Sequence, residues 1–265
     1  MTAPSGPPAP GSAIVYTAVG ASDATGHGAS IECVPFTPCP DGTGYVPVAT
    51  RQLRAQGFAV TLLNLGIPTA VIGRDFETLG QQYNRTIVSN FIESEMPFVQ
   101  PNSTVVTIFA GGNEVNTMTA ALGAGAGGSD PAGFIDAQVR AFGADYATLM
   151  SGIRGRAPSA RFVVLNLPNL GALPYLSGAS LEQRQAAQRA AVAMTTTVIN
   201  PLSGSTVSVI DLMCDPRAYQ SGQYFSDGFH PNDAGYAFIA AEVVKAITSS
   251  YPAPRGSCPQ MALVP

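Results

Sequence analysis

One of the two histidines in the chain follows an aspartate at a spacing that suits general-base catalysis. Asp227 and His230 lie in the segment Ser226–Asn232, which reads SDGFHPN. A catalytic histidine needs an acceptor on its second ring nitrogen to fix its tautomer, and a carboxylate three residues earlier can reach that nitrogen. Pro231 disfavours helical dihedrals at His230, so we expect the imidazole on a loop before a helix that Asn232 or Asp233 can cap. Taken alone, the pattern also fits a surface loop with a helix cap.

The chain alternates segments of strand type and helix type. Short apolar runs rich in β-branched residues are typical of buried parallel strands, and they cover Ala13–Val19, Phe58–Leu65, Thr104–Ala110, Arg161–Leu167 and Thr206–Leu212. Helical spacing is found in Tyr45–Gln56, Phe134–Arg154, Leu181–Ile199 and Asp233–Ser249. Strands that alternate with helices imply right-handed crossovers. The sequence therefore predicts a three-layer α/β/α sandwich with a five-stranded parallel sheet.

Polar groups that can do chemistry follow several of the predicted strands. Ser22 follows the first run, Gly66 the second and Asn113 the third, while Asp227 and His230 come after the fifth. In a sheet of parallel strands, ligands bind beyond the carboxyl ends of the strands. We therefore expect these five residues at the same end of the sheet.

Together, these residues can fill the roles that acyl transfer to a serine requires. Ser22 would be the nucleophile, His230 would remove its proton, and Asp227 would hold the imidazole. The backbone N–H groups of Ser22 and Gly66 and the side-chain amide of Asn113 would form the oxyanion hole. Each residue alone also fits a turn or a strand-to-helix connection, so the prediction depends on their joint occurrence in this order.

In this order, the residues resemble the motif blocks of the SGNH hydrolases, also called the GDSL family of lipases and esterases. The resemblance extends from Ile14 to about Ile247. It implies a flavodoxin-like α/β/α fold and ester hydrolysis through an acyl-enzyme, with neither metal nor cofactor. The matching blocks are Ser22 in VGASD, Gly66 in NLG, Asn113 in GGNE, and Asp227 with His230 in DGFHPN.

Two positions depart from the pattern of that family. Ala21 precedes Ser22 where the family usually has aspartate, so a carboxylate that often holds this loop is absent or is replaced by Asp23, which we expect to position the turn. Glu114 follows Asn113 where the family again usually has aspartate. We expect these changes to affect loop geometry rather than the chemistry.

A second family of serine hydrolases has to be weighed against this one. The segment Gly20–Ala24 nearly matches the Gly-x-Ser-x-Gly elbow of the α/β-hydrolases. However, the serine follows the first strand, and the acid and base are adjacent near the carboxyl end of the chain. This order favours the SGNH arrangement.

The second histidine and the substrate pocket are less well defined by the sequence. His27 has no carboxylate at the spacing that separates Asp227 from His230, so we expect it to contact the rim of the site or to be exposed. Candidate pocket segments are Glu32–Tyr45, the Gly-rich Gly123–Gly133, and Leu167–Leu176. The last suits an acyl chain, although an apolar loop packed on its own domain fits equally well.

Composition excludes several classes of partner. Charged residues make up only 11% of the 265 residues and the formal net charge is −4, which leaves no basic surface for nucleic acid or an anionic membrane. No run approaches the roughly 18 apolar residues that span a bilayer, and no strand-end loop offers a phosphate cradle for a nucleotide or flavin. We expect a monomer with a disordered Pro/Ala/Gly-rich segment over residues 1–12 and a single domain over residues 13–265.

The four cysteines suggest disulfides and export. Cys33, Cys39, Cys214 and Cys258 allow three pairings, of which we prefer Cys33–Cys39 and Cys214–Cys258. The chain has no Cys-x-x-Cys and no histidine at a ligand-like spacing from a cysteine, which argues against a metal site. No signal peptide is recognisable, so we expect a secreted or periplasmic protein whose signal has been replaced by Met1.

The leading functional prediction is a serine esterase or lipase for carboxylic esters with short to medium acyl chains. An O-acetyl esterase acting on polysaccharide would use the same mechanism and stays open, because Tyr and Phe can replace the absent Trp in stacking on sugars. A non-catalytic binding module with the same fold is the alternative from another class. The presence of all five site residues argues against it.

Overall fold

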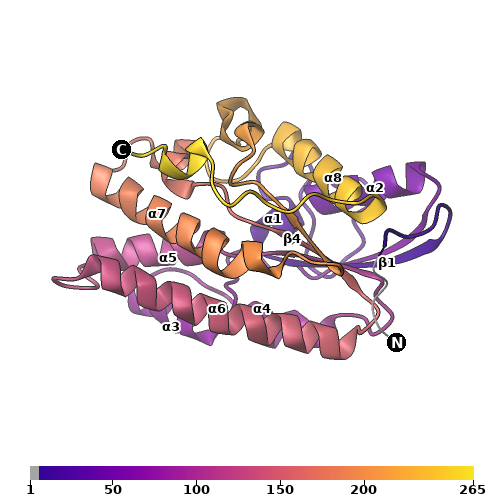
Figure 1. The fold of residues 1–265 in the computed structure, drawn as a ribbon, viewed down its shortest axis with the longest axis horizontal. Coiled ribbons are helices and arrows are strands. Elements are labelled where there is room, and N and C mark those ends of the chain that lie inside the picture. The colour runs from indigo at the N-terminus through magenta and orange to yellow at the C-terminus, as the bar shows by residue number, and fades with distance from the viewer. Residues whose placement is uncertain (1–5) are drawn as a thin grey trace.

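The chain forms a parallel β-sheet with helices on both faces (Figure 1). The computed structural model describes residues 6–265. Within this range the sheet has five strands in the order β2-β1-β3-β4-β5. The strands are β1 (Ala13–Gly20), β2 (Ala59–Asn64), β3 (Val105–Phe109), β4 (Arg161–Leu165) and β5 (Val207–Ile210). The predicted three-layer α/β/α sandwich is confirmed.

The order of the strands opens a crevice at one end of the sheet. β1 pairs with β2 on one side, starting at Ala13 and Ala59, and with β3 on the other side, ending at Gly20 and Phe109. The chain therefore leaves β1 toward one edge of the sheet and β3 toward the other edge. In open α/β sheets, ligands bind at the point where the strand order reverses in this way. The chain segments that follow β1 and β3 are those that carry Ser22 and Asn113.

Different helices cover the two faces of the sheet (Figure 1). α2 packs against α8 on one face, while α7 packs against α5 and α6 on the other. The helices are α1 (Ser22–Thr25), α2 (Tyr45–Ala55), α3 (Arg74–Gln82), α4 (Phe91–Ser94), α5 (Gly112–Gly123), α6 (Pro131–Arg156), α7 (Leu181–Ala193) and α8 (Asp233–Thr248).

Each face of the sheet has its own hydrophobic core, because successive side chains of a strand point to opposite faces. Tyr16 and Ala18 of β1 belong to the core under α2 and α8, whereas Val19 belongs to the core under α5, α6 and α7. β3 alternates in the same way, with Val105 in the first core and Val106 in the second. The strands are thus buried on both faces, as their continuous apolar runs predict.

All five predicted strands and all four predicted helices are present, with shifted ends. α6 begins at Pro131, three residues before the predicted start, because the side chain of Asp130 accepts from the backbone N–H of Gly133 and caps it. α7 ends at Ala193 and continues as a π-helix over Met194–Ile199. The prediction missed α3 and α5 and the short helices α1 and α4. α5 starts within the Gly-Gly-Asn-Glu block at Gly112, where glycines are typical of a loop.

Both predicted disulfides are confirmed. Cys33 pairs with Cys39 and Cys214 with Cys258, with Cα–Cα distances of 5.6 and 5.7 Å. The second bond joins the segment after β5 to the carboxyl-terminal tail. Among the described helices, none has the length and apolar character to cross a membrane.

The predicted amino-terminal segment is only partly covered by the structure. Residues 1–5 lie outside the described residues, and residues 6–12 contain no helix or strand.

Candidate active site

The structure brings Ser22, His230 and Asp227 together in one chain of hydrogen bonds. Ser22 Oγ lies 2.8 Å from His230 Nε2, and His230 Nδ1 lies 2.6 Å from Asp227 Oδ2. Ser22 and His230 are 208 residues apart in the sequence. A serine, an imidazole and a carboxylate in this geometry can transfer the serine proton to the imidazole while the carboxylate stabilises the resulting cation.

Ser22 is placed by the sharp connection from β1 to α1. It is the first residue of this short helix, and its side chain is buried, with 6% of the residue exposed. The carbonyl of Ser22 accepts from Thr25 Oγ1 and from the backbone N–H of His27. Gly26 then ends the helix with a φ of 78°, and a Cβ at this position would lie 2.7 Å from Gly44 Cα. Only glycine therefore fits this turn without strain.

The loop that carries the base is held mainly by its own residues. Asp227 Oδ1 accepts from the backbone N–H groups of Phe229 and His230, at 2.9 and 3.0 Å. Burial opposes ionisation of Asp227, but the hydrogen bonds from the His230 side chain and from these two backbone groups outweigh it and lower the pKa of the carboxyl. Asn232 caps α8 by accepting from the N–H groups of Ala234 and Gly235, as predicted.

A distant carboxyl holds the strand end that precedes the serine. Glu95 Oε2 accepts from the backbone N–H of Gly20 at 2.9 Å, and Glu95 is fully buried. Burial raises the pKa of this carboxyl well above its usual value, and the hydrogen bond from Gly20 only partly opposes the shift. The expectation that Asp23 takes this role was wrong. Its carboxylate accepts no hydrogen bond from another residue in the described range. Glu95 gave no signal in the sequence because it lies 75 residues from Gly20.

The three predicted oxyanion donors differ in availability. The backbone N–H of Ser22 begins α1, where no intrahelical carbonyl can reach it. Asn113 uses its amide nitrogen to donate to the carbonyl of Ala70 at 2.9 Å, which leaves one of its two N–H bonds for a ligand. The N–H of Gly66, in contrast, donates to Asn64 Oδ1 at 3.1 Å.

Close packing explains the glycine at position 66. A Cβ there would lie 2.6 Å from the Cβ of Ala24 and 3.1 Å from the carbonyl oxygen of Ala21. Asn64 joins the same two segments, because its amide nitrogen donates to the carbonyl of Ala24 at 2.7 Å. The loop after β2 is therefore fixed against the serine turn.

Glu114 anchors the asparagine block from inside the protein. Its Oε1 accepts from the backbone N–H of Ile72 at 2.5 Å, while its Oε2 is buried with no hydrogen-bond partner in the described range. Burial raises its pKa to about 7, against smaller opposing effects of backbone hydrogen bonds. The loop after β2 and the start of α5 are thus joined one residue beyond Asn113.

His27 has a carboxylate partner that the sequence analysis missed. Its Nδ1 lies 3.1 Å from Glu32 Oε1, and Glu32 also accepts from the N–H of Gly28. The ring of His27 meets that of His230 edge to face, with 4.5 Å between centroids. The expected position at the rim fits this contact, and the carboxylate partner lies five residues after His27, beyond the three-residue spacing that the sequence analysis considered. A turn over Gly26 and Gly28 folds the chain back, and sequence spacing does not reveal such a turn.

A metal at this site would compete with the hydrogen bonds just described. In residues 6–265, His27, Asp227 and His230 offer ligand atoms within 4.8 Å of one another. Asp227 and His230 are hydrogen-bonded to each other, and His230 is also hydrogen-bonded to Ser22. The arrangement in the structure is that of a proton-transfer chain.

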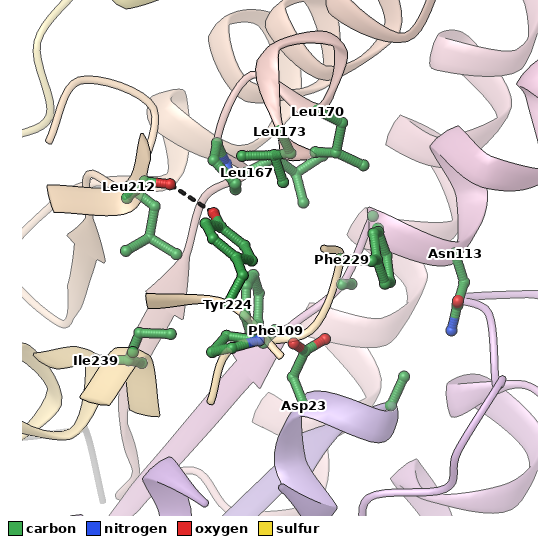
Figure 2. A pocket seen from close by; sticks show the side chains of 18 of the residues that line it. Asp23, Phe109, Asn113, Leu167, Leu170, Leu173, Leu212, Tyr224, Phe229 and Ile239 are labelled. Carbon is green, nitrogen blue, oxygen red and sulfur yellow. Dashed lines mark hydrogen bonds between the residues drawn. The ribbon is translucent and has the colours of Figure 1, made fainter. Parts of the chain in front are cut away.

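An apolar cavity of about 60 Å³ lies beside the oxyanion donors (Figure 2). Asn113 is at one end, and Phe229 lies between Asn113 and Tyr224 in this view. Phe229 packs edge to face against His230 on one side and Tyr175 on the other. The segment Leu167–Leu176, predicted as a candidate acyl site, contributes Leu167, Leu170 and Leu173 to the lining.

The other candidate pocket segments are placed away from this cavity. The loop that contains Cys33 and Cys39 lines a second hollow of about 280 Å³ against β2 and α2. The Gly-rich segment forms the turns between α5 and α6 and contributes no residue to the lining of either cavity.

Comparison with known proteins identifies the family. A sequence model of the family described as GDSL-like Lipase/Acylhydrolase matches residues 16–243. No curated protein matches the chain in sequence.

Solved structures share the fold at low sequence identity. The lipase Lip_vut3 from a goat rumen metagenome has a TM-score of 0.61 at 19% identity, covering 89% of this chain and 98% of that one. An extracellular lipase from Streptomyces rimosus has a TM-score of 0.61 at 17% identity, covering 89% and 100%. An acetylxylan esterase from Geobacillus stearothermophilus has a TM-score of 0.56 at 14% identity, covering 93% and 99%. The family match extends over most of the chain, so this protein belongs to the GDSL-like lipases and acylhydrolases and is a carboxylic ester hydrolase.

Proposed function

We propose that the protein hydrolyses carboxylic esters through Ser22, His230 and Asp227, with an acyl-enzyme intermediate. The observation that carries this proposal is the continuous chain of hydrogen bonds, 2.8 Å from Ser22 Oγ to His230 Nε2 and 2.6 Å from His230 Nδ1 to Asp227 Oδ2. Because Asp227 has a lowered pKa, it is ionised at neutral pH and can stabilise the imidazolium.

Each step of the reaction uses a group of this chain. His230 Nε2 takes the proton of Ser22 as Oγ attacks the ester carbonyl, and the carbonyl oxygen becomes an oxyanion. The imidazolium then gives that proton to the leaving alkoxide, which departs as an alcohol and leaves an acyl-serine. In the second half, His230 takes a proton from water, the resulting hydroxide attacks the acyl-serine, and the proton returns to Ser22.

Two of the three donors can donate to the oxyanion directly, whereas the third already donates to another group of the protein. The N–H of Ser22 and the second amide hydrogen of Asn113 can donate to it directly. The N–H of Gly66 would have to be shared between Asn64 Oδ1 and the substrate. In a related type of site, loss of one such donor costs about 3–4 kcal/mol of transition-state stabilisation.

The size of the cavity favours esters of short acyl chains. A single water needs about 10–15 Å³, so a cavity of about 60 Å³ has room for a small acyl group. An O-acetyl esterase acting on polysaccharide is therefore the second candidate. It predicts release of acetate from acetylated xylan and a steep fall of activity as the acyl chain lengthens.

We also propose that the protein acts outside the cytoplasm as a single domain over residues 13–265. The two disulfides support this location, because such bonds persist in oxidising compartments. That the monomer is the active form stays a prediction.

A fluorophosphonate and intact-protein mass spectrometry test the proposed nucleophile. We expect a single adduct on the wild type and none on Ser22→Ala. Ser226→Ala, which removes an exposed serine of the base loop, is the matched control and should be labelled like the wild type. A wild type that forms no adduct, or a Ser22→Ala variant that still does, would contradict the proposal.

A further inference from the structure

The apolar cavity adjoins the turn that carries the proposed nucleophile, because both neighbours of Ser22 in the chain, Ala21 and Asp23, line it. Its lining includes Ala21, the residue before the proposed nucleophile, and Asn113, the proposed oxyanion donor. From there it extends past Phe229 to Leu212 and Ile239 at the opposite end (Figure 2). An ester carbonyl held between Ser22 and Asn113 would therefore direct its acyl chain along this cavity.

The carboxylate of Asp23 belongs to the lining of this apolar space. Figure 2 shows the carboxylate of Asp23 directed into the cavity, between Phe229 and Tyr224. Within residues 6–265 it accepts no hydrogen bond from another residue. Burial raises the pKa of this carboxyl, and the electrostatic effect of His230 opposes that shift only in part. The residue is half-buried, so a ligand that fills the cavity and excludes solvent from this carboxylate must supply a hydrogen-bond donor or leave it unpaired at a cost in free energy.

The surroundings of Asp23 indicate which kind of donor fits. The walls nearest to it in Figure 2 are the aromatic rings of Phe109, Phe229 and Tyr224. The hydroxyl of Tyr224 is not free, because it donates to the carbonyl of Ala218. A cationic ligand would lose its hydration in such surroundings. A hydroxyl loses less hydration free energy than a cation. It can donate to an ionised carboxylate or accept from a protonated one.

We propose that this cavity binds the acyl part of the substrate and that Asp23 selects short acyl groups that carry a hydroxyl. The inference rests on the proposed function, and it names the substrate class of that site. Its volume of about 60 Å³ favours small groups of this kind. A site built to bind a hydroxyl strongly rejects the analogue that lacks it, since its own polar group is then left unpaired.

The test compares p-nitrophenyl 3-hydroxybutanoate with p-nitrophenyl butanoate. We expect the wild type to favour the hydroxy ester by about tenfold to a hundredfold in kcat/KM, the range for a hydrogen bond to a charged group. Asp23→Leu, which is similar in shape and cannot accept a hydrogen bond, should reverse this preference. Because the readout is a ratio between two substrates in one variant, damage common to both cancels.

A cavity-filling variant is the matched control. Leu212→Phe adds volume at the end of the cavity away from Asn113. It should lower kcat/KM for both four-carbon esters, while their ratio stays as in the wild type. A ratio unchanged by Asp23→Leu, or a wild type that favours butanoate, would overturn the inference.

A binding measurement separates this inference from the proposed function. Calorimetry on Ser22→Ala with 3-hydroxybutanamide and butanamide reports the preference of the cavity without turnover. Tighter binding of the hydroxy amide, lost in Ser22→Ala combined with Asp23→Leu, supports the inference even if no ester is hydrolysed. Equal binding of the two amides overturns it, even if the enzyme is active on simple esters.

Discussion

The loop of the proposed base and the loop of the proposed nucleophile are held in different ways. The base loop, Asp227–Asn232, is held mostly from within, because one oxygen of Asp227 accepts from backbone groups two and three residues ahead and the other bonds the imidazole. The turn that carries Ser22 depends on partners far along the chain, namely Glu95, Asn64 and Gly44. The two halves of one site thus differ in how far their geometry can be inferred from local sequence.

This difference has consequences for substitutions. A change at Asp227 should act on the chemistry and leave the fold intact, since its carboxylate accepts hydrogen bonds only from Phe229 and His230 of the same loop. A change at a distant support of the serine turn should affect both activity and stability.

The largest effect should come from the base loop. Asp227→Asn keeps an acceptor for the backbone but no longer fixes the tautomer of His230, and a change of this kind lowers kcat by about 10⁴ in a comparable triad. We expect little change in the melting temperature, measured beside kcat on a p-nitrophenyl ester. Asp136→Asn, which breaks an exposed ion pair with Arg189, is the control and should behave like the wild type. A loss below tenfold in Asp227→Asn would count against the assigned role.

Glu95 tests the supports of the serine turn. Burial raises the pKa of Glu95 and so favours its neutral form. Glu95→Gln is neutral and keeps an oxygen that can accept from Gly20, so it should stay within about threefold of the wild type in kcat. Glu95→Ala leaves the N–H of Gly20 unpaired and should lower kcat by about tenfold to a hundredfold, since small displacements of reacting groups have effects of this size. KM should change little, and the rate of fluorophosphonate labelling should fall with kcat.

Two results would contradict this view of Glu95. One is a Glu95→Ala variant with the kcat of the wild type and a lower melting temperature, which would make the residue purely structural. The other is a Glu95→Gln variant as impaired as Glu95→Ala, which would mean that the carboxyl acts in its charged form.

The raised pKa of Glu114 predicts how the free energy of unfolding depends on pH. Its pKa is raised from 4.5 to about 7 in the folded protein, so its contribution is fully present below pH 4.5 and is lost as the pH rises toward 7. At about 1.4 kcal/mol per pKa unit, this loss amounts to about 3 kcal/mol. Urea unfolding at pH 4.5 and 7.5 should show a smaller fall for Glu114→Gln than for the wild type. Equal falls in the two proteins would exclude a buried neutral carboxyl at this position.

The smallest effect concerns the cap that ends the base loop. Asn232→Ala removes the acceptor for the first turn of α8 and two donations to the carbonyls of Gly222 and Tyr224. Loss of an N-cap costs about 0.5–2 kcal/mol, and we expect the upper part of this range, measured by thermal unfolding. If the activity falls more than the stability loss explains, the cap also positions His230.

Much of the fold could be predicted because its signals are local. Continuous apolar runs identified the strands from β1 to β5, and their alternation with helices identified the architecture. α5 was missed because its first turn consists of glycine and polar residues, which take their helical form only when packed against the neighbouring segments. α6 was predicted short at its start, since its first turn depends on the cap from Asp130.

The sequence by itself determined the local parts of the site: the pairing of Asp227 with His230, the cap by Asn232, and the positions of Ser22, Gly66 and Asn113 after their strands. Only the tertiary structure decided that Glu95 rather than Asp23 holds the serine turn, that Glu32 binds His27, and that the N–H of Gly66 is already used by Asn64. Hydrogen bonds within three residues follow from backbone geometry alone. A buried carboxyl that bonds a backbone group 75 residues away depends on how the whole sheet and its helices pack.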